Sequence, residues 1–130
     1  MIPDHPNALL AKAAWEAVSA GDVDALAELC ADDLVWYASG RGPRAGTHRG
    51  RDEVLGYLAS LGEAVDQFDS TLENLLVGGN LVAVLFRVSG ARKGRKLDTG
   101  FILLFHIEAS RLTEVWAVPR DQYAVDEFWA

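Results

Sequence analysis

The stretch AGDVDALAELCADDLVWYA, residues 20–38, contains the change of pattern that decides the fold. Gly21 is typical of the position just after a helix, and Asp22 is typical of the position just before a new one. Apolar residues then keep helical spacing as far as Cys30. The β-branched and aromatic residues of LVWYA, 34–38, predict a strand instead. This stretch therefore predicts a short helix followed closely by a strand.

Two further helices are predicted on either side of this stretch. Residues 7–20 are rich in Ala and Leu at helical spacing, with Asn7 as the expected N-cap. A third helix is predicted to open at residues 50–53, because acidic residues in a first turn suit the helix dipole.

Four β-rich runs follow, at residues 67–77, 81–89, 97–106 and 112–117, joined by hairpin-like turns. Helices first and hairpins after predict an α+β fold, with N-terminal helices packed on a strongly curved mixed or antiparallel sheet. Two stretches within them, 81–86 and 101–105, do not alternate and are apolar on both faces of the sheet. We therefore expect a homodimer in which a second copy covers the outer face.

Length and composition limit the classes of protein that fit. The 130 residues predict one domain over 1–130. A net charge of −7 argues against a nucleic-acid binder, and no apolar run approaches the ~20 residues that cross a membrane. Residues 1–6 lack the features of a signal peptide, and Cys30 is the only cysteine. We therefore expect a cytoplasmic protein.

The positive charge is concentrated in two stretches, which have two interpretations. The first is that they are solvated loops and a hairpin tip, and the second is that they form a local rim that attracts anions. The residues are Arg41, Arg44, Arg49 and Arg51 in one stretch, and Arg87, Arg92, Lys93, Arg95 and Lys96 in the other.

Four strings carry a family resemblance: AGDVDAL (20–26), ADDLVW (31–36), AGTHRGRDEV (45–54) and RLTEVW (111–116). They resemble the SnoaL-like branch of the nuclear transport factor 2-like superfamily. The resemblance implies a cone-shaped α+β barrel around an apolar pocket. The residues expected at this pocket are Trp15, Trp36, Ala38, Phe101, Leu103, Trp116 and Tyr123, although the tryptophans are also typical core residues. The aromatic segment 123–129 is expected to dock over the pocket mouth or a neighbouring subunit.

The resemblance does not extend to ketosteroid isomerase activity. That mechanism needs a carboxylate base, a tyrosine and a protonated aspartate. The corresponding places hold Ala38, Ala14 and the acid-free run 101–105. The apolar strands also lack the two inward acids expected of an epoxide hydrolase.

Two residues are candidate acid/base groups. Polyketide-cyclase relatives use an aspartate near the end of the last strand, where this chain has Asp121. The alternative is that Asp121 caps a helix over 122–128. His48 is the second candidate, because an imidazole changes its protonation near neutral pH. The alternative for His48 is a structural role.

The sequence therefore predicts a protein that holds a small hydrophobic molecule in an apolar pocket. Cofactor-free cyclase, isomerase or hydrolase chemistry is one extension of that prediction. A non-catalytic ligand-binding or dimeric interaction module is the alternative. The three histidines have unrelated spacing, so neither a metal site nor a cofactor is expected.

Overall fold

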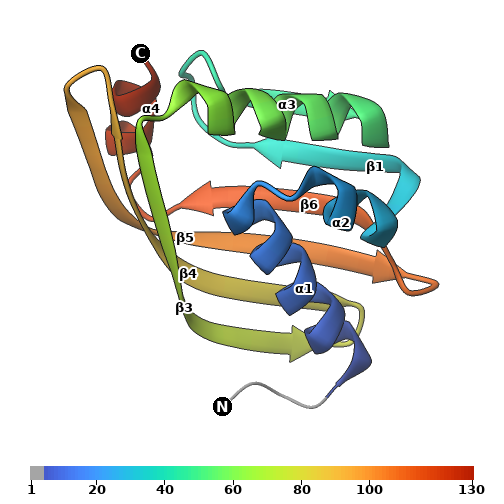
Figure 1. Cartoon of the computed structure of the whole chain (residues 1–130). Helices are drawn as coiled ribbons and strands as arrows, with labels where there is room; N and C mark the ends of the chain where they lie inside the picture. The colour runs from blue at the N-terminus through green and yellow to red at the C-terminus, as the bar shows by residue number, and fades with distance from the viewer. Residues whose placement is uncertain (1–4) are drawn as a thin grey trace.

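The computed structural model describes residues 5–130, and its elements follow the predicted order (Figure 1). Two helices, two strands and a third helix make up the first half, three long hairpin-linked strands and a shorter one come next, and a short helix ends the chain. The elements are α1 (Pro6–Ala20), α2 (Val23–Leu29), β1 (Cys30–Ala38), β2 (Gly46–Arg49), α3 (Arg51–Ala64), β3 (Gln67–Gly78), β4 (Leu81–Arg92), β5 (Arg95–Glu108), β6 (Arg111–Pro119) and α4 (Gln122–Trp129).

Local signals set most of the helix ends. Gly21 follows α1 with a φ of 68°, a left-handed conformation that a glycine adopts without steric cost. Asp22 caps α2 by accepting a hydrogen bond from the backbone N–H three residues later. The prediction of Asn7 as the cap of α1 is wrong, because the ring of His5 accepts the hydrogen bond from the Asn7 N–H. Cys30 begins β1 and does not extend α2.

The six strands form one mixed sheet in the order β2-β1-β6-β5-β4-β3. Consecutive strands pair antiparallel from β3 to β6, as the hairpin-like turns predicted. After β2, the chain passes through α3 to the far edge of the sheet, and β6 returns to the middle beside β1. The pair β1–β6 is therefore parallel.

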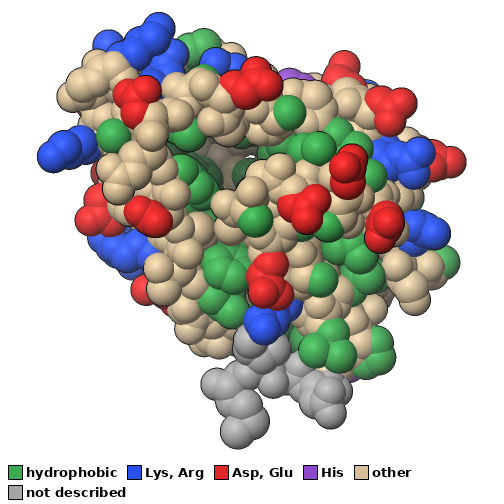
Figure 2. Space-filling model, in the orientation of Figure 1, with side chains coloured by type: hydrophobic (Ala, Val, Ile, Leu, Met, Phe, Trp, Pro, Cys, Tyr) green, Lys and Arg blue, Asp and Glu red, His purple; other side chains and the backbone are tan. Residues whose placement is uncertain are grey.

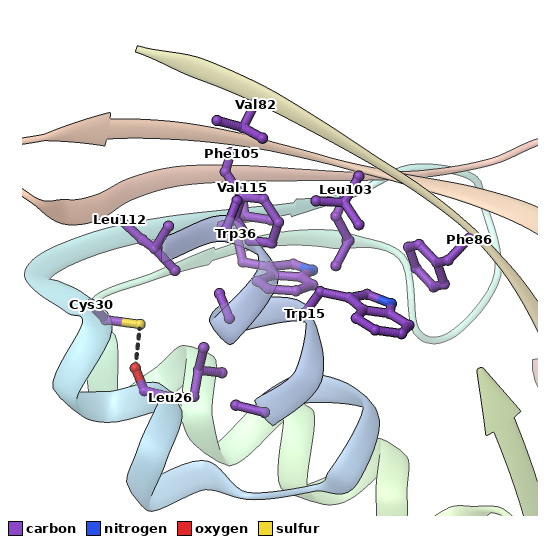
Figure 3. Close-up of a cluster of buried hydrophobic side chains, with 14 of the residues drawn as sticks. Trp15, Leu26, Cys30, Trp36, Val82, Phe86, Leu103, Phe105, Leu112 and Val115 are labelled. Carbon is purple, nitrogen blue, oxygen red and sulfur yellow. Dashed lines mark hydrogen bonds between the residues drawn. The ribbon is translucent and has the colours of Figure 1, made fainter. Parts of the chain in front are cut away.

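The helices α1 and α3 lie on the same face of the sheet (Figure 1). Helix α1 packs on β3, β4 and β5, and α3 packs on β1 and β2. Side chains such as Trp15, Trp36 and Phe105 point toward one another between these layers (Figure 3). In the same cluster, the Cys30 thiol donates to the Leu26 carbonyl at 3.1 Å.

Strands β3, β4 and β5 are the longest and bend strongly, so the sheet is concave on the face that carries the helices (Figure 1). The helices packed on a strongly curved mixed sheet confirm the predicted α+β architecture. Within residues 5–130, none of the helices has the length and hydrophobicity needed to cross a membrane.

Candidate functional site

A cavity of about 610 Å³ lies between the concave face of the sheet and the helices. It opens as a hollow in the surface, with hydrophobic side chains in its wall (Figure 2). The C-terminal end of α1, one side of α3 and the end of α4 complete its wall. Its principal lining side chains are Val18, Leu26, Trp36, Ala38, Arg44, Tyr57, Leu58, Leu61, Phe86, Val88, Leu97, Phe101, Leu103, Val125, Asp126, Phe128 and Trp129.

Strand alternation brings four predicted pocket residues together. Trp36 and Ala38 lie two positions apart on β1, and Phe101 and Leu103 lie two positions apart on β5, so each pair shares one face of the sheet. All four line the cavity. Phe86 of β4 joins them, with its ring centroid 5.7 Å from that of Phe101.

The other three predicted pocket residues are not among the lining residues. Trp15 is buried in the core behind Phe86, with ring centroids 6.0 Å apart. Trp116 points to the outer face of the sheet, because its neighbours on β6 point inward, and there it stacks on Tyr37. Tyr123 is 89% exposed on α4.

Asp121 lies at the start of α4 and does not line the cavity. Its carboxylate accepts a hydrogen bond from the backbone N–H of Ala124 at 3.1 Å. This contact is the N-cap that the sequence offered as the alternative to catalysis. A catalytic role for Asp121 stays a prediction, and the absence of Asp121 from the residues that line the cavity does not favour it.

His48 lies behind the cavity wall. It is paired with Trp36 across β1 and β2, and its ring stacks on that of Tyr57 with centroids 3.8 Å apart. Its Nδ1 atom is 3.9 Å from a carboxylate oxygen of Glu53. Its Nε2 atom is buried and has no hydrogen-bond partner among residues 5–130. Tyr57 lines the cavity and His48 does not, so the catalytic role of His48 also stays a prediction.

Tyr57 is a polar wall residue that sequence reasoning missed. Its hydroxyl donates to the carbonyl of Arg44 at 2.6 Å. Burial raises the pKa of Tyr57, and the nearby Arg44 charge partly opposes that shift. The only available signal was its place on the inward side of a predicted helix, where it follows Val54 by three residues.

Helix α4 closes one side of the cavity with Val125, Asp126, Phe128 and Trp129. Asp126 attaches the helix to the loop after β1, because its carboxylate accepts hydrogen bonds from the backbone N–H groups of Arg41 and Gly42, both at 3.2 Å. Partial desolvation acts to raise the pKa of Asp126, but these bonds, the Gln122 amide and the Arg41 charge lower it below its ordinary value.

Each carboxylate that lines the cavity either accepts hydrogen bonds from the backbone or is exposed to solvent. None of them is a buried group that could act as a general acid or base. Asp22 caps α2, Glu63 is exposed on α3, and Asp126 accepts the hydrogen bonds described above. Across residues 5–130, no cluster of three His, Cys, Asp or Glu side chains has the arrangement of a metal site. The site is therefore an apolar chamber whose three lining carboxylates are hydrogen-bonded elsewhere or exposed to solvent.

The chain matches a family model described as a SnoaL-like domain over residues 11–115. An uncharacterised protein of Mycobacterium tuberculosis is 30% identical over 130 residues, which cover 98% of each chain. The solved structure of Bal32a, from a soil-derived mobile gene cassette, is 28% identical with a TM-score of 0.91, covering 96% of this chain and 97% of that one. A nuclear transport factor 2-like protein of Burkholderia xenovorans is 23% identical with a TM-score of 0.86 over the whole of both chains, a likeness of fold.

Proposed function

The chain belongs to the SnoaL-like family and has the nuclear transport factor 2-like fold, and we propose that it binds a small, largely apolar molecule in its cavity. The observation that carries this proposal is the cavity itself. Its volume of about 610 Å³ is in the range of small-molecule sites, roughly 300–1,000 Å³.

The composition of the wall supports an apolar ligand. Trp36, Phe86, Phe101 and Leu103 present hydrophobic surface on the sheet side of the chamber. Removing apolar surface from water stabilises a complex by roughly 25 cal/mol for each Å² buried. A ligand with an aromatic or alicyclic body therefore fits this wall better than a polar metabolite does.

The first experiment uses N-phenyl-1-naphthylamine, a neutral aromatic compound that fluoresces strongly in apolar surroundings. We expect it to bind the wild-type protein and to raise its melting temperature. A ligand at about one hundred times its Kd stabilises the native state by about 2.7 kcal/mol. Fluorescence titration gives the affinity, and circular dichroism gives the melting temperature.

Two matched variants test whether the cavity is the site. Ala38→Leu adds a side chain inside the cavity, whereas Ala13→Leu adds the same group to an exposed position of α1. We expect Ala38→Leu to weaken binding about tenfold or more, since it fills space that the probe needs, and Ala13→Leu to leave the affinity unchanged. Absence of binding to the wild type would contradict the proposed function and favour the dimeric interaction module.

A second candidate is cofactor-free proton transfer, such as cyclisation, isomerisation or hydration. The observation that favours it is the Nε2 atom of His48, which has no hydrogen-bond partner among residues 5–130 and belongs to a ring stacked on the lining residue Tyr57. His48→Phe keeps a ring against Tyr57 and removes both nitrogens. If a turnover is found, the second candidate requires that His48→Phe or Asp121→Asn abolish it with ligand affinity unchanged.

A further inference from the structure

Two arginines from distant parts of the chain meet at one tryptophan beside the cavity mouth. Arg44 comes from the loop before β2, and Arg92 is the last residue of β4. Their guanidinium carbons lie 5.3 Å and 5.4 Å from the centre of the Trp129 ring. The two basic stretches of the sequence therefore each contribute one charge to the same place.

Strand alternation explains why Arg92 points inward. Val82, Val84, Phe86 and Val88 face the interior, and Arg92 continues their alternate positions on β4. It is only 8% exposed, which is unusual for a charged side chain.

Neither arginine has an acidic partner in the part of the chain that the structure describes. No carboxylate among residues 5–130 forms an ion pair with Arg44 or Arg92, although Arg51 and Arg87 each have one. Arg92 donates to the Phe128 carbonyl at 3.3 Å, and its Nε atom has no hydrogen-bond partner among these residues. The charge of Arg92 is therefore buried without an acidic partner among these residues, which is costly, and a negative group bound beside Trp129 would stabilise it.

Attachment of α4 accounts for only part of this arrangement. Cations at the end of a helix stabilise its last carbonyl groups. Arg95 already donates to the carbonyls of Glu127 and Ala130 there. Arg44, in contrast, lines the cavity. Its guanidinium group donates a hydrogen bond to the Ser60 hydroxyl at 3.4 Å. Its remaining N–H donors have no hydrogen-bond partner within residues 5–130 and can bind a ligand.

We propose that the ligand is an amphipathic organic acid, whose apolar body fills the cavity and whose anionic group binds Arg44 at the mouth. Arg92 adds positive potential from behind Trp129. The Asp126 carboxylate does not take the place of the anion, because backbone N–H groups hold it on the loop after β1. This inference rests on the proposed function and adds the chemical class of the ligand.

The test compares two probes with the same aromatic body. N-phenyl-1-naphthylamine is neutral, and 8-anilino-1-naphthalenesulfonate carries an added sulfonate. Arg44→Gln removes the proposed contact. Arg87→Gln removes the same charge from the outer face of the sheet, where Arg87 pairs with Asp98 at 2.9 Å. Fluorescence titration of the full chain gives each Kd, and displacement of one probe by the other shows that they share a site.

We expect Arg44→Gln to raise the Kd of the sulfonate probe about tenfold, because hydrogen bonds to charged groups are the strong ones. The Kd of the neutral probe should stay within about twofold. Arg87→Gln should change neither value by more than that. In the wild type, raising the salt from about 0.05 M to about 0.5 M should weaken only the sulfonate probe, since salt screens the contact.

Three results would overturn the inference. The first is an equal effect of Arg44→Gln on both probes, and the second is an equal effect of Arg44→Gln and Arg87→Gln on the sulfonate probe. The third is wild-type binding of the sulfonate without salt dependence, which remains measurable even if Arg44→Gln does not fold. Binding of the neutral probe in any of these cases would leave the proposed function standing. Binding of neither probe would overturn both.

Discussion

Cys30 shows how one residue changes its chemistry through its position at the junction of α2 and β1. The side chain is buried and donates to the Leu26 carbonyl. Burial raises the pKa of the thiol from its ordinary 9.0 to about 11, and the charges of Arg51 and Arg111 oppose that shift. A thiol that keeps its proton is a poor nucleophile, so Cys30 acts as a small core residue.

We predict that the native protein does not react with Ellman's reagent at about pH 8 and that one thiol reacts after denaturation. Fast labelling of the native protein would contradict this assignment. Between pH 9.0 and about 11, the unfolded chain releases a proton that the native thiol keeps. The free energy of unfolding should therefore fall as the pH rises through this range, and Cys30→Ala should remove that part of the fall.

At the scale of a single element, α4 is held by contacts near its middle and at its C-terminal end. Its aromatic face is held by Phe128, which is buried, and by Trp129 under the two arginines. Near its middle, Asp126 accepts hydrogen bonds from the loop after β1. These contacts hold Val125, Asp126, Phe128 and Trp129 of α4 in the wall of the cavity.

We predict that Asp126→Asn speeds hydrogen exchange of the amides in α4, because an amide replaces the charged acceptor of two backbone N–H groups. Glu127→Gln, with the same change of charge on an exposed neighbour, should leave that exchange unchanged. The pKa of Asp126 is lowered, so its contribution to stability is present above the ordinary 3.8 and is lost as the pH falls below it. Acid should therefore speed α4 exchange in the wild type more than in the Asn variant, and an equal acid effect in both would contradict the assignment.

At the scale of the whole molecule, the outer face of the sheet stays uncovered by any described helix. Leu76, Ile102 and Val118 are 55%, 39% and 44% exposed there. Ile102 and Val118 are direct neighbours on β5 and β6, so they form part of one continuous apolar surface. A surface of this kind favours the predicted homodimer, in which two copies pack sheet to sheet.

We predict that the protein is a dimer at micromolar concentration and that Ile102→Lys converts it to a monomer, because the lysine would be buried in the interface without a partner. Leu9→Lys, which places the same charge on an exposed leucine of α1, should leave the dimer intact. Size-exclusion chromatography with light scattering measures both masses. A monomeric wild type would refute the dimer.

The type and order of most elements could be predicted from the sequence, because caps, helical spacing and β-branched content act over a few residues. Strand alternation also pairs Trp36 with Ala38, and Phe101 with Leu103, on one face of each strand. The family resemblance implied that these faces point into the pocket, and all four side chains line the cavity. Alternation could not place Trp116, since it does not say which face is the inner one, and Tyr123 lies on the exposed side of α4.

The elements that close the cavity, and the arginines that lie beside it, became apparent only in the tertiary structure. The parallel pairing of β1 with β6, the docking of α4 and the meeting of Arg44 with Arg92 at Trp129 all join residues far apart in the chain. Such contacts depend on the curvature of the sheet and on the register of its long strands, and no local pattern encodes either of these.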